Sequence, residues 1–106
     1  MGDVLLQERT RQFLQDPLLG KQDIDAKVRS LLEAEYLRRL GQYRRQDRIL
    51  AQKYGMTFEA FMERRTVRQE GYTWDVEQDA MDWETAVGGM RMMKRRLLEL
   101  REAERV

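Results

Sequence analysis

Apolar residues recur every three or four positions along two long stretches of the chain, a spacing that is typical of amphipathic helices. The first stretch covers residues 23–54 and the second covers residues 75–104. The apolar positions of the first are Ile24, Val28, Leu31, Leu32, Leu37, Leu40, Tyr43, Leu50 and Tyr54. Those of the second are Val76, Ala80, Trp83, Val87, Met90 and Leu97, and Met93, Leu98 and Leu100 widen the face toward its end. The widened face predicts that more than one helix packs there.

Between the two long stretches, the segment "KYGMTFEAFMERR" has the signals of a helix stop followed by a helix start. Gly55 fits the left-handed position after a helix, and Thr57 fits the cap of the next one. Met56 and Phe61 have the spacing of a hydrophobic staple across that cap, so a short helix is predicted over residues 57–66. The segment "TVRQEGYTWDV" that follows is expected to be a loop, with a brief hairpin as the alternative.

Residues 1–20 form a shorter amphipathic arm, which Pro17 and Gly20 interrupt. Strong helix formers such as Leu, Arg, Glu, Gln, Met and Ala dominate the chain, while the residues that favour strands are scarce. We therefore predict an all-α fold over residues 1–106, with a single helical domain in which a short helix connects a hairpin of two long helices.

The charges of the two long helices are segregated along the chain. Residues 36–53 carry six basic residues against Asp47 alone, whereas residues 70–84 carry six acidic residues and no basic one. The signs reverse at the other ends, with acids near residue 25 and bases near residue 95. An antiparallel hairpin places acids opposite bases at both ends, and a parallel pair would oppose like charges. Exposed ion pairs contribute only ~0 to 1 kcal/mol each, so this pattern sets orientation more than stability.

Three glycines, Gly41, Gly88 and Gly89, lie inside the predicted long helices. Together they cost roughly 2 to 3 kcal/mol relative to alanine in an exposed helix, so a compensating role is expected. If Tyr54 lies level with Asp75, Gly41 falls opposite Gly88, which favours a close approach of the two helices there. A kink, or room for a partner's side chain, are the alternatives.

The segment "YTWDVEQDAMDWETAVGG" contains both tryptophans of the chain and three aspartates on one helix face. Asp75, Asp79 and Asp82 have a spacing that suits a hard cation, but acids also stabilise the N-terminal end of a helix, and no calcium loop surrounds them. We therefore expect no metal. Trp83 follows the apolar stripe, which predicts a buried ring, whereas Trp74 lies on the opposite side of the helix, where it can contact the short helix or a partner.

The residue inventory argues against an enzyme and against a cofactor, since the chain has no histidine, no cysteine and a single serine. No window approaches the ~20 apolar residues of a membrane span, so a soluble cytoplasmic protein is expected. The net charge is +1, and no nucleic-acid-binding motif accompanies the densest basic run, so DNA binding is a less favoured alternative. That run consists of Arg38, Arg39, Arg44, Arg45 and Arg48.

The block "AQKYGMTFEAFMERR…YTWDVEQDAMDWE" resembles small antitoxin proteins of prokaryotic toxin–antitoxin pairs, over roughly residues 50–104. The matching residues are Tyr54, Gly55, Met56, Phe58, Glu59, Phe61, Asp79 and Trp83. The resemblance implies a non-enzymatic helical protein that wraps and neutralises a partner toxin, with a nuclease as one candidate.

Independently of that resemblance, the two apolar stripes have more apolar surface than one hairpin can bury. A protein partner or self-association into an oligomeric bundle is therefore expected. The residues predicted for this interface are Leu31, Leu40, Trp74, Val87, Met90, Met93 and Leu97. Structural roles are predicted for Gly41, Gly55, Phe61, Trp83, Gly88 and Gly89. A homo-oligomerising structural module is the alternative function, and a carboxylate-metal enzyme that uses Asp75, Asp79 and Asp82 is a weaker one.

Overall fold

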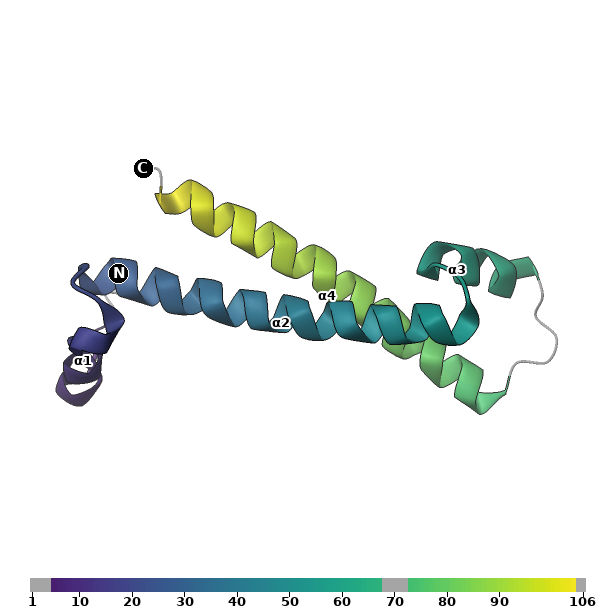
Figure 1. Cartoon of the computed structure of the whole chain (residues 1–106), viewed down its shortest axis with the longest axis horizontal. Coiled ribbons are helices and arrows are strands. Elements are labelled where there is room, and N and C mark those ends of the chain that lie inside the picture. The colour runs from purple at the N-terminus through teal and green to yellow at the C-terminus, as the bar shows by residue number, and fades with distance from the viewer. Residues whose placement is uncertain (1–4, 68–72, 105–106) are drawn as a thin grey trace. The chain divides into compact units, whose positions relative to one another are not determined.

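The computed structural model describes residues 5–67 and 73–104, and these residues fold into helices (Figure 1). The elements are α1 (Glu8–Leu14), a 3₁₀ turn η1 (Pro17–Leu19), α2 (Ile24–Tyr54), α3 (Phe58–Val67) and α4 (Trp74–Glu104). No strand occurs in these two ranges, so the all-α prediction is confirmed. Of the segment predicted as a loop or hairpin, residues 66–76, the ends belong to α3 and α4, and residues 68–72 lie outside the described residues.

The chain divides into two compact units, Met1–Ala34 and Glu35–Val106. In the first unit, the Asp23 side chain accepts a hydrogen bond from the Ala26 backbone N–H (2.8 Å) at the start of α2. The buried Lys27 ammonium donates to the Leu14 carbonyl (2.6 Å) at the end of α1. Because the last carbonyls of a helix lack helical partners and carry partial negative charge, this bond ties α1 to α2. The prediction of a single domain stays a prediction.

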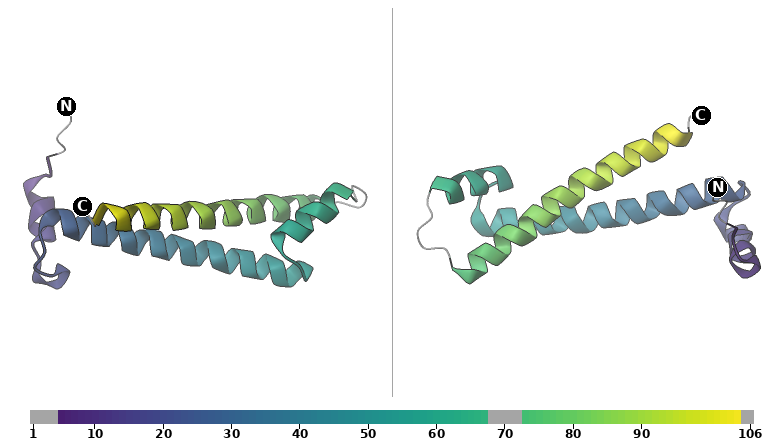
Figure 2. Two further views of the ribbon diagram at one scale, coloured as in Figure 1. Left: turned by 90° about the horizontal axis from the view of Figure 1, so that it is seen from above. Right: turned by 180° about the vertical axis from the view of Figure 1, so that it is seen from behind.

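In the second unit, α4 runs antiparallel to residues 35–54 of α2, and α3 packs where α2 ends (Figures 1 and 2). The fully buried Trp83 joins the three helices: its ring centroid lies 5.1 Å from that of Phe61, 5.6 Å from that of Phe58 and 6.0 Å from that of Tyr54. Its indole Nε1–H donates to Asp47 (2.8 Å). Trp83 therefore lies in the core, as its place in the apolar stripe predicts.

A second core cluster holds α2 and α4 together farther along the hairpin. It consists of the buried Leu40, Met93 and Leu97, with Tyr36, Tyr43 and Met90 packed against it. The sequence analysis assigned Leu40, Met93 and Leu97 to a partner interface. The structure buries all three in the core of the hairpin, because the apolar face of α2 covers that of α4, so they do not lie on its exposed surface.

The turn between α2 and α3 follows its sequence signals. Gly55 has φ 66°, in the left-handed region where a side chain is strained, and the Met56 N–H donates to the Ala51 carbonyl (3.2 Å). The Thr57 hydroxyl oxygen accepts from the Ala60 N–H (3.2 Å) and caps α3. The chain can therefore reverse tightly, which places Phe61 against the end of α2.

The predicted pairing of the two long helices differs at the Tyr54 end of the hairpin. The Tyr54 hydroxyl donates to the Asp79 carboxylate (2.5 Å), whereas the prediction set Tyr54 opposite Asp75. The predicted close approach of Gly41 and Gly88 is wrong, because a Cβ added at either residue would meet nothing within 4 Å. At Gly89 an added Cβ would lie 2.5 Å from the Tyr43 ring. The close contact therefore joins the Tyr43 ring to the backbone at Gly89. A side chain at residue 89 would overlap the space that the ring occupies.

Candidate interaction surface

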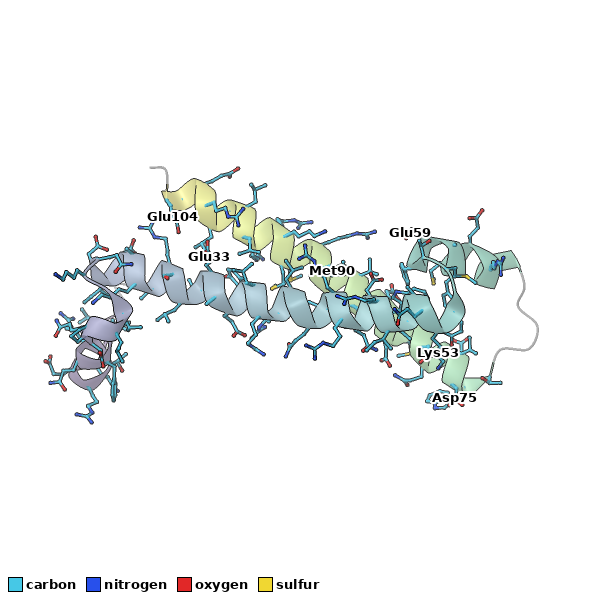
Figure 3. All side chains as sticks on the ribbon, in the orientation of Figure 1. Glu33, Lys53, Glu59, Asp75, Met90 and Glu104 are labelled. Carbon is cyan, nitrogen blue, oxygen red and sulfur yellow. The ribbon has the colours of Figure 1, made fainter. Side chains whose placement is uncertain are left out.

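The acidic start of α4 meets the basic end of α2 through Asp79. Its carboxylate accepts from the Lys53 ammonium (2.5 Å) and from the Tyr54 hydroxyl (2.5 Å), and Figure 3 places Lys53 and Asp75 at the same end of the hairpin. Hydrogen bonds from Lys53 and then from Tyr54 hold the pKa of Asp79 below its usual range. Burial, followed by the bond to Asp79, raises the pKa of Tyr54 to about 12. These opposite charges match the antiparallel orientation that the charge pattern predicts.

The three aspartates proposed as a weak metal site are not brought together as one. Asp79 is occupied by Lys53 and Tyr54, and Asp82 accepts from the Gln78 side chain on its own helix (3.0 Å). Within residues 5–67 and 73–104, no group of three acidic side chains could hold a metal ion. The spacing along α4 therefore serves hydrogen bonds within the protein.

The basic run of α2 is partly neutralised by an acid of its own helix. Arg38 donates to Glu35 through two bonds (2.7 and 2.9 Å), and Arg39 donates to the same carboxylate (2.5 Å). These bonds, from Arg38 first, lower the pKa of Glu35 to about 2. The antiparallel charge pattern predicts that this end of α2 faces the acids of α4, and the ion pair that the structure shows there joins Lys53 to Asp79.

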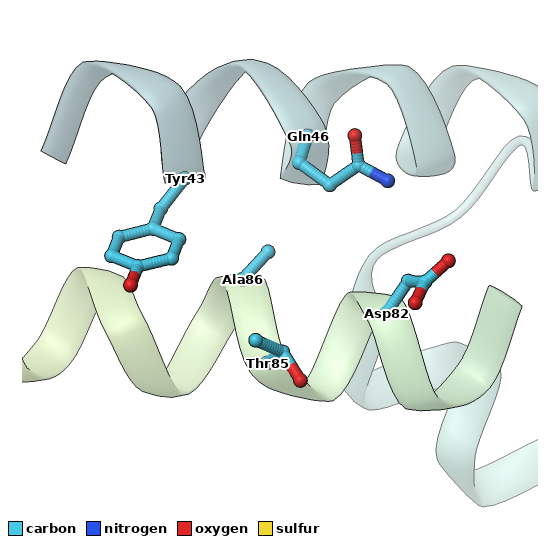
Figure 4. Close-up of a pocket in the computed structure, with 5 residues that line it drawn as sticks. All are labelled: Tyr43, Gln46, Asp82, Thr85 and Ala86. Atoms are coloured by element: carbon cyan, nitrogen blue, oxygen red, sulfur yellow. The ribbon is translucent and has the colours of Figure 1, made fainter. Parts of the chain in front are cut away.

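Two hollows lie between the helices of the second unit. One, of about 260 Å³, lies between α2 and α4 and is lined by Tyr43 and Gln46 on one side and by Asp82, Thr85 and Ala86 on the other (Figure 4). It presents the carboxylate of Asp82 and the hydroxyls of Tyr43 and Thr85, and the Thr85 hydroxyl donates to the Met81 carbonyl of its own helix (3.0 Å). These side chains can form hydrogen bonds with a ligand, but they do not form an assembled catalytic group.

The other hollow, of about 280 Å³, lies where α2, α3 and α4 meet. Ala51, Phe58, Val87 and Met90 supply apolar lining, and Arg91 stands at the rim beside Glu59, with a 3.8 Å ion pair between them. Val87 and Met90, which were predicted as interface residues, thus remain half-buried around a groove. Leu31, another predicted interface residue, is exposed in the first unit.

The side of α4 that faces away from Trp83 is exposed along its whole length. Trp74 is 76% exposed, Met81 57% and Met92 52%. Steps of four and three residues connect them with other exposed positions into one line, which we call the outer stripe. Its residues are Trp74, Gln78, Met81, Thr85, Gly88, Met92, Arg95 and Glu99.

The sequence pattern predicted Trp74 of this stripe as an interface residue but not Met81 or Met92. The signal that identifies both methionines is their heptad-like spacing on the side of the helix opposite Trp83. The pattern of apolar residues does not single them out, because polar residues alternate with them. A stripe that mixes methionine with glutamine, threonine and arginine differs little in hydrophobicity from the surrounding surface.

Comparison with known proteins gives no relative for this arrangement: the chain matches no family model, no curated protein and no solved structure. Among the described helices, none combines the length and the apolar character that crossing a membrane requires.

Proposed function

We propose that the protein is a non-enzymatic helical interaction protein, antitoxin-like, that binds and neutralises a partner toxin. The observation that carries this proposal is the exposure of Trp74. Its ring is the most exposed aromatic ring described in the second unit, and Trp74 is the first residue of α4, next to Asp75. Tryptophan is enriched among the residues that dominate binding energy, because it covers a large area at little entropic cost. A side chain of this kind, exposed to water in the free chain, favours a partner that covers it.

The acids around Trp74 support a partner of a particular charge. Asp75 and Glu77 lie in the first turn of α4, and Glu84 is exposed farther along it. A cationic surface complements such a helix end, and a nuclease needs a cationic surface to hold the phosphates of its substrate. An acidic helix seated there would exclude the nucleic acid, which is a direct physical route to neutralisation.

Co-expression tests the proposal. A small reading frame next to the gene of this protein should inhibit growth when it is expressed alone, and growth should recover when the full chain is expressed with it. Purification of either protein should then recover the other in a stable complex. Inhibition that persists in the presence of the full chain would contradict the proposed function.

A matched pair of variants tests the role of the ring. Trp74→Ala should weaken the complex by about 30-fold, the effect of losing about 2 kcal/mol at a binding hot spot. Ile49→Ala is the control, because Ile49 is also an exposed apolar residue (50%) but lies on α2. Equal affinity of the two variants, measured by calorimetric titration, would remove Trp74 from the interface.

A second candidate function, a homo-oligomerising helical module, is favoured by a different observation. The outer stripe is exposed at every one of its positions from Trp74 to Glu99, well beyond the patch around Trp74 alone. An exposed stripe that follows one helix for seven turns suits another helix better than it suits a compact pocket. Light scattering of the isolated chain separates this module from a monomeric interaction protein.

A further inference from the structure

We infer that α4 pairs with the α4 helix of a second copy of this chain, antiparallel and through the outer stripe, to form a closed two-fold dimer. This inference deepens the self-association named as the second candidate function and rests on it. The order of side chains along the stripe, the charges beside it and the surroundings of Gly88 each support it.

The outer stripe has the same pattern when it is read in either direction. Its positions alternate in steps of four and three, as the core positions of a coiled coil do. When a second α4 is laid antiparallel with the two-fold axis between Ala86 and Val87, Met81 falls opposite Met92 of the second copy, and Thr85 falls opposite its Gly88. Each contact occurs twice by symmetry, so the exposed methionines of both chains are covered together.

The outer layers of this register are also compatible. Gln78 falls opposite Arg95 of the second copy, and an amide oxygen accepts a hydrogen bond from a guanidinium. Trp74 falls opposite Glu99, beside the exposed Leu98. The pairing therefore covers all four large apolar side chains that α4 exposes, which are Trp74, Met81, Met92 and Leu98.

The charges that flank the stripe select the antiparallel orientation. In the antiparallel register Glu84 lies beside Arg91 of the second copy, and Asp75 lies beside its Arg96. A parallel pair in register would instead set Glu77 near Asp82 and Arg91 near Arg96, which are contacts between like charges. Electrostatic complementarity thus distinguishes the two orientations, although the apolar residues alone would permit both.

The second copy also gives a reason for Gly88. In the single chain an added Cβ at Gly88 would meet nothing within 4 Å, so packing within the protein does not require a glycine there. Glycine inside a helix is unfavourable relative to alanine. At the centre of the proposed dimer, Gly88 faces Thr85 of the second copy, and two small residues in the central layers allow the two helices to approach closely.

The geometry predicts an assembly that stops at two chains. Both copies present the same surface, so a two-fold pair uses both outer stripes and leaves none for a third copy. Light scattering and sedimentation equilibrium of the full chain should therefore give a concentration-dependent species with twice the mass of 12.8 kDa.

Charge reversal tests the flanking pairs. Glu84→Arg and Arg91→Glu should each weaken the dimer by about tenfold, since each replaces two attractive contacts with two repulsive ones. The double variant Glu84→Arg/Arg91→Glu should recover most of the loss. Arg45→Glu is the control, because it reverses an exposed charge on α2 and should leave the dimer constant unchanged. Circular dichroism shows whether each variant retains its helices.

Cysteine crosslinking tests the register, and the natural chain contains no cysteine to confuse it. An equimolar mixture of Met81→Cys and Met92→Cys proteins should form a disulfide dimer under mild oxidation, and neither protein alone should. In the antiparallel register two copies of residue 81 are separated by eleven positions along the helix, about 16 Å, which is beyond the reach of a disulfide.

Three outcomes would overturn this interface. Efficient crosslinking of either single-cysteine protein alone would indicate a parallel pair. A dimer that neither charge reversal nor the cysteine mixture affects would show that self-association uses another surface, and the second candidate function would then survive without this interface. A monomer of 12.8 kDa at high concentration would contradict both this interface and the second candidate function. The toxin-binding proposal would still be decided by co-expression.

Discussion

Replacing Trp83 with alanine should unfold the second unit or bring it close to unfolding. The side chain is 0% exposed and contacts the rings of Tyr54, Phe58 and Phe61, so its loss leaves a cavity between three helices. Truncation of a buried tryptophan to alanine costs about 3 to 5 kcal/mol. Whole domains of ordinary stability have only about 5 to 15 kcal/mol to lose.

The indole hydrogen bond adds a second, separable contribution. The Trp83 Nε1–H donates to the Asp47 carboxylate at 2.8 Å. Asp47→Ala keeps the ring but leaves a buried donor without its acceptor, which should cost about 1 to 3 kcal/mol. Trp83→Phe loses the same bond while it keeps most of the ring contact, so its cost should be similar and well below that of Trp83→Ala.

Urea denaturation followed by circular dichroism measures these free energies of unfolding. At protein concentrations low enough to exclude dimers, Trp74→Ala is the matched control, because it removes the same side chain from an exposed position of the same helix and should change stability by no more than about 0.5 kcal/mol. If Trp83→Ala costs less than about 1 kcal/mol, or if Trp74→Ala costs as much as Trp83→Ala, the assignment of one ring to the core and the other to the surface is refuted.

Two further predictions concern the glycines and Asp79. At protein concentrations low enough to exclude dimers, Gly88→Ala should raise the midpoint of thermal unfolding by removing about 1 kcal/mol of helix penalty. Gly89→Ala should raise it less, because the Tyr43 ring must move aside to admit the new methyl group, and equal shifts would contradict the packing at Gly89. The pKa of Asp79 is depressed in the folded chain, so its contribution to stability is complete above the unfolded pKa of about 3.9 and is lost as the pH falls toward the folded value. The free energy of unfolding of Asp79→Asn should therefore change less with pH in the acid range than that of the natural chain. An unchanged pH profile would show that the contact with Lys53 contributes nothing to stability.

The sequence predicted those parts of the fold that depend on local chemistry. Gly55 and Thr57 identify the helix stop and start through backbone conformation and capping, and both act within a few residues. The place of Trp83 followed from helical periodicity. The contact of Tyr54 with Asp79 instead of Asp75 was not predicted, because it depends on how far the Tyr54 side chain reaches, and periodicity carries no information about reach.

The candidate site was harder to predict than the fold, for a different physical reason. An apolar stripe shows that a face will be covered, but it does not show which surface covers it. Leu40 and Met93 were assigned to an external partner for this reason, although the two helices of the hairpin cover them for each other. Met81 and Met92 were missed because their stripe alternates with polar residues, so a search for continuous apolar faces selects the inner side of α4 and passes over the outer one.

The two sides of α4 differ in a way that matches two kinds of contact. The inner side buries Ala80, Trp83 and Ala86 against α2 and α3, with ring contacts that fix one arrangement. The outer stripe mixes Met81 and Met92 with polar and small residues, a composition closer to that of reversible interfaces than to that of a core. Methionine side chains also adapt to more than one partner, because they are flexible and polarisable. The hairpin can therefore keep its fold while the outer stripe exchanges one protein surface for another, which a chain that both self-associates and neutralises a toxin would require.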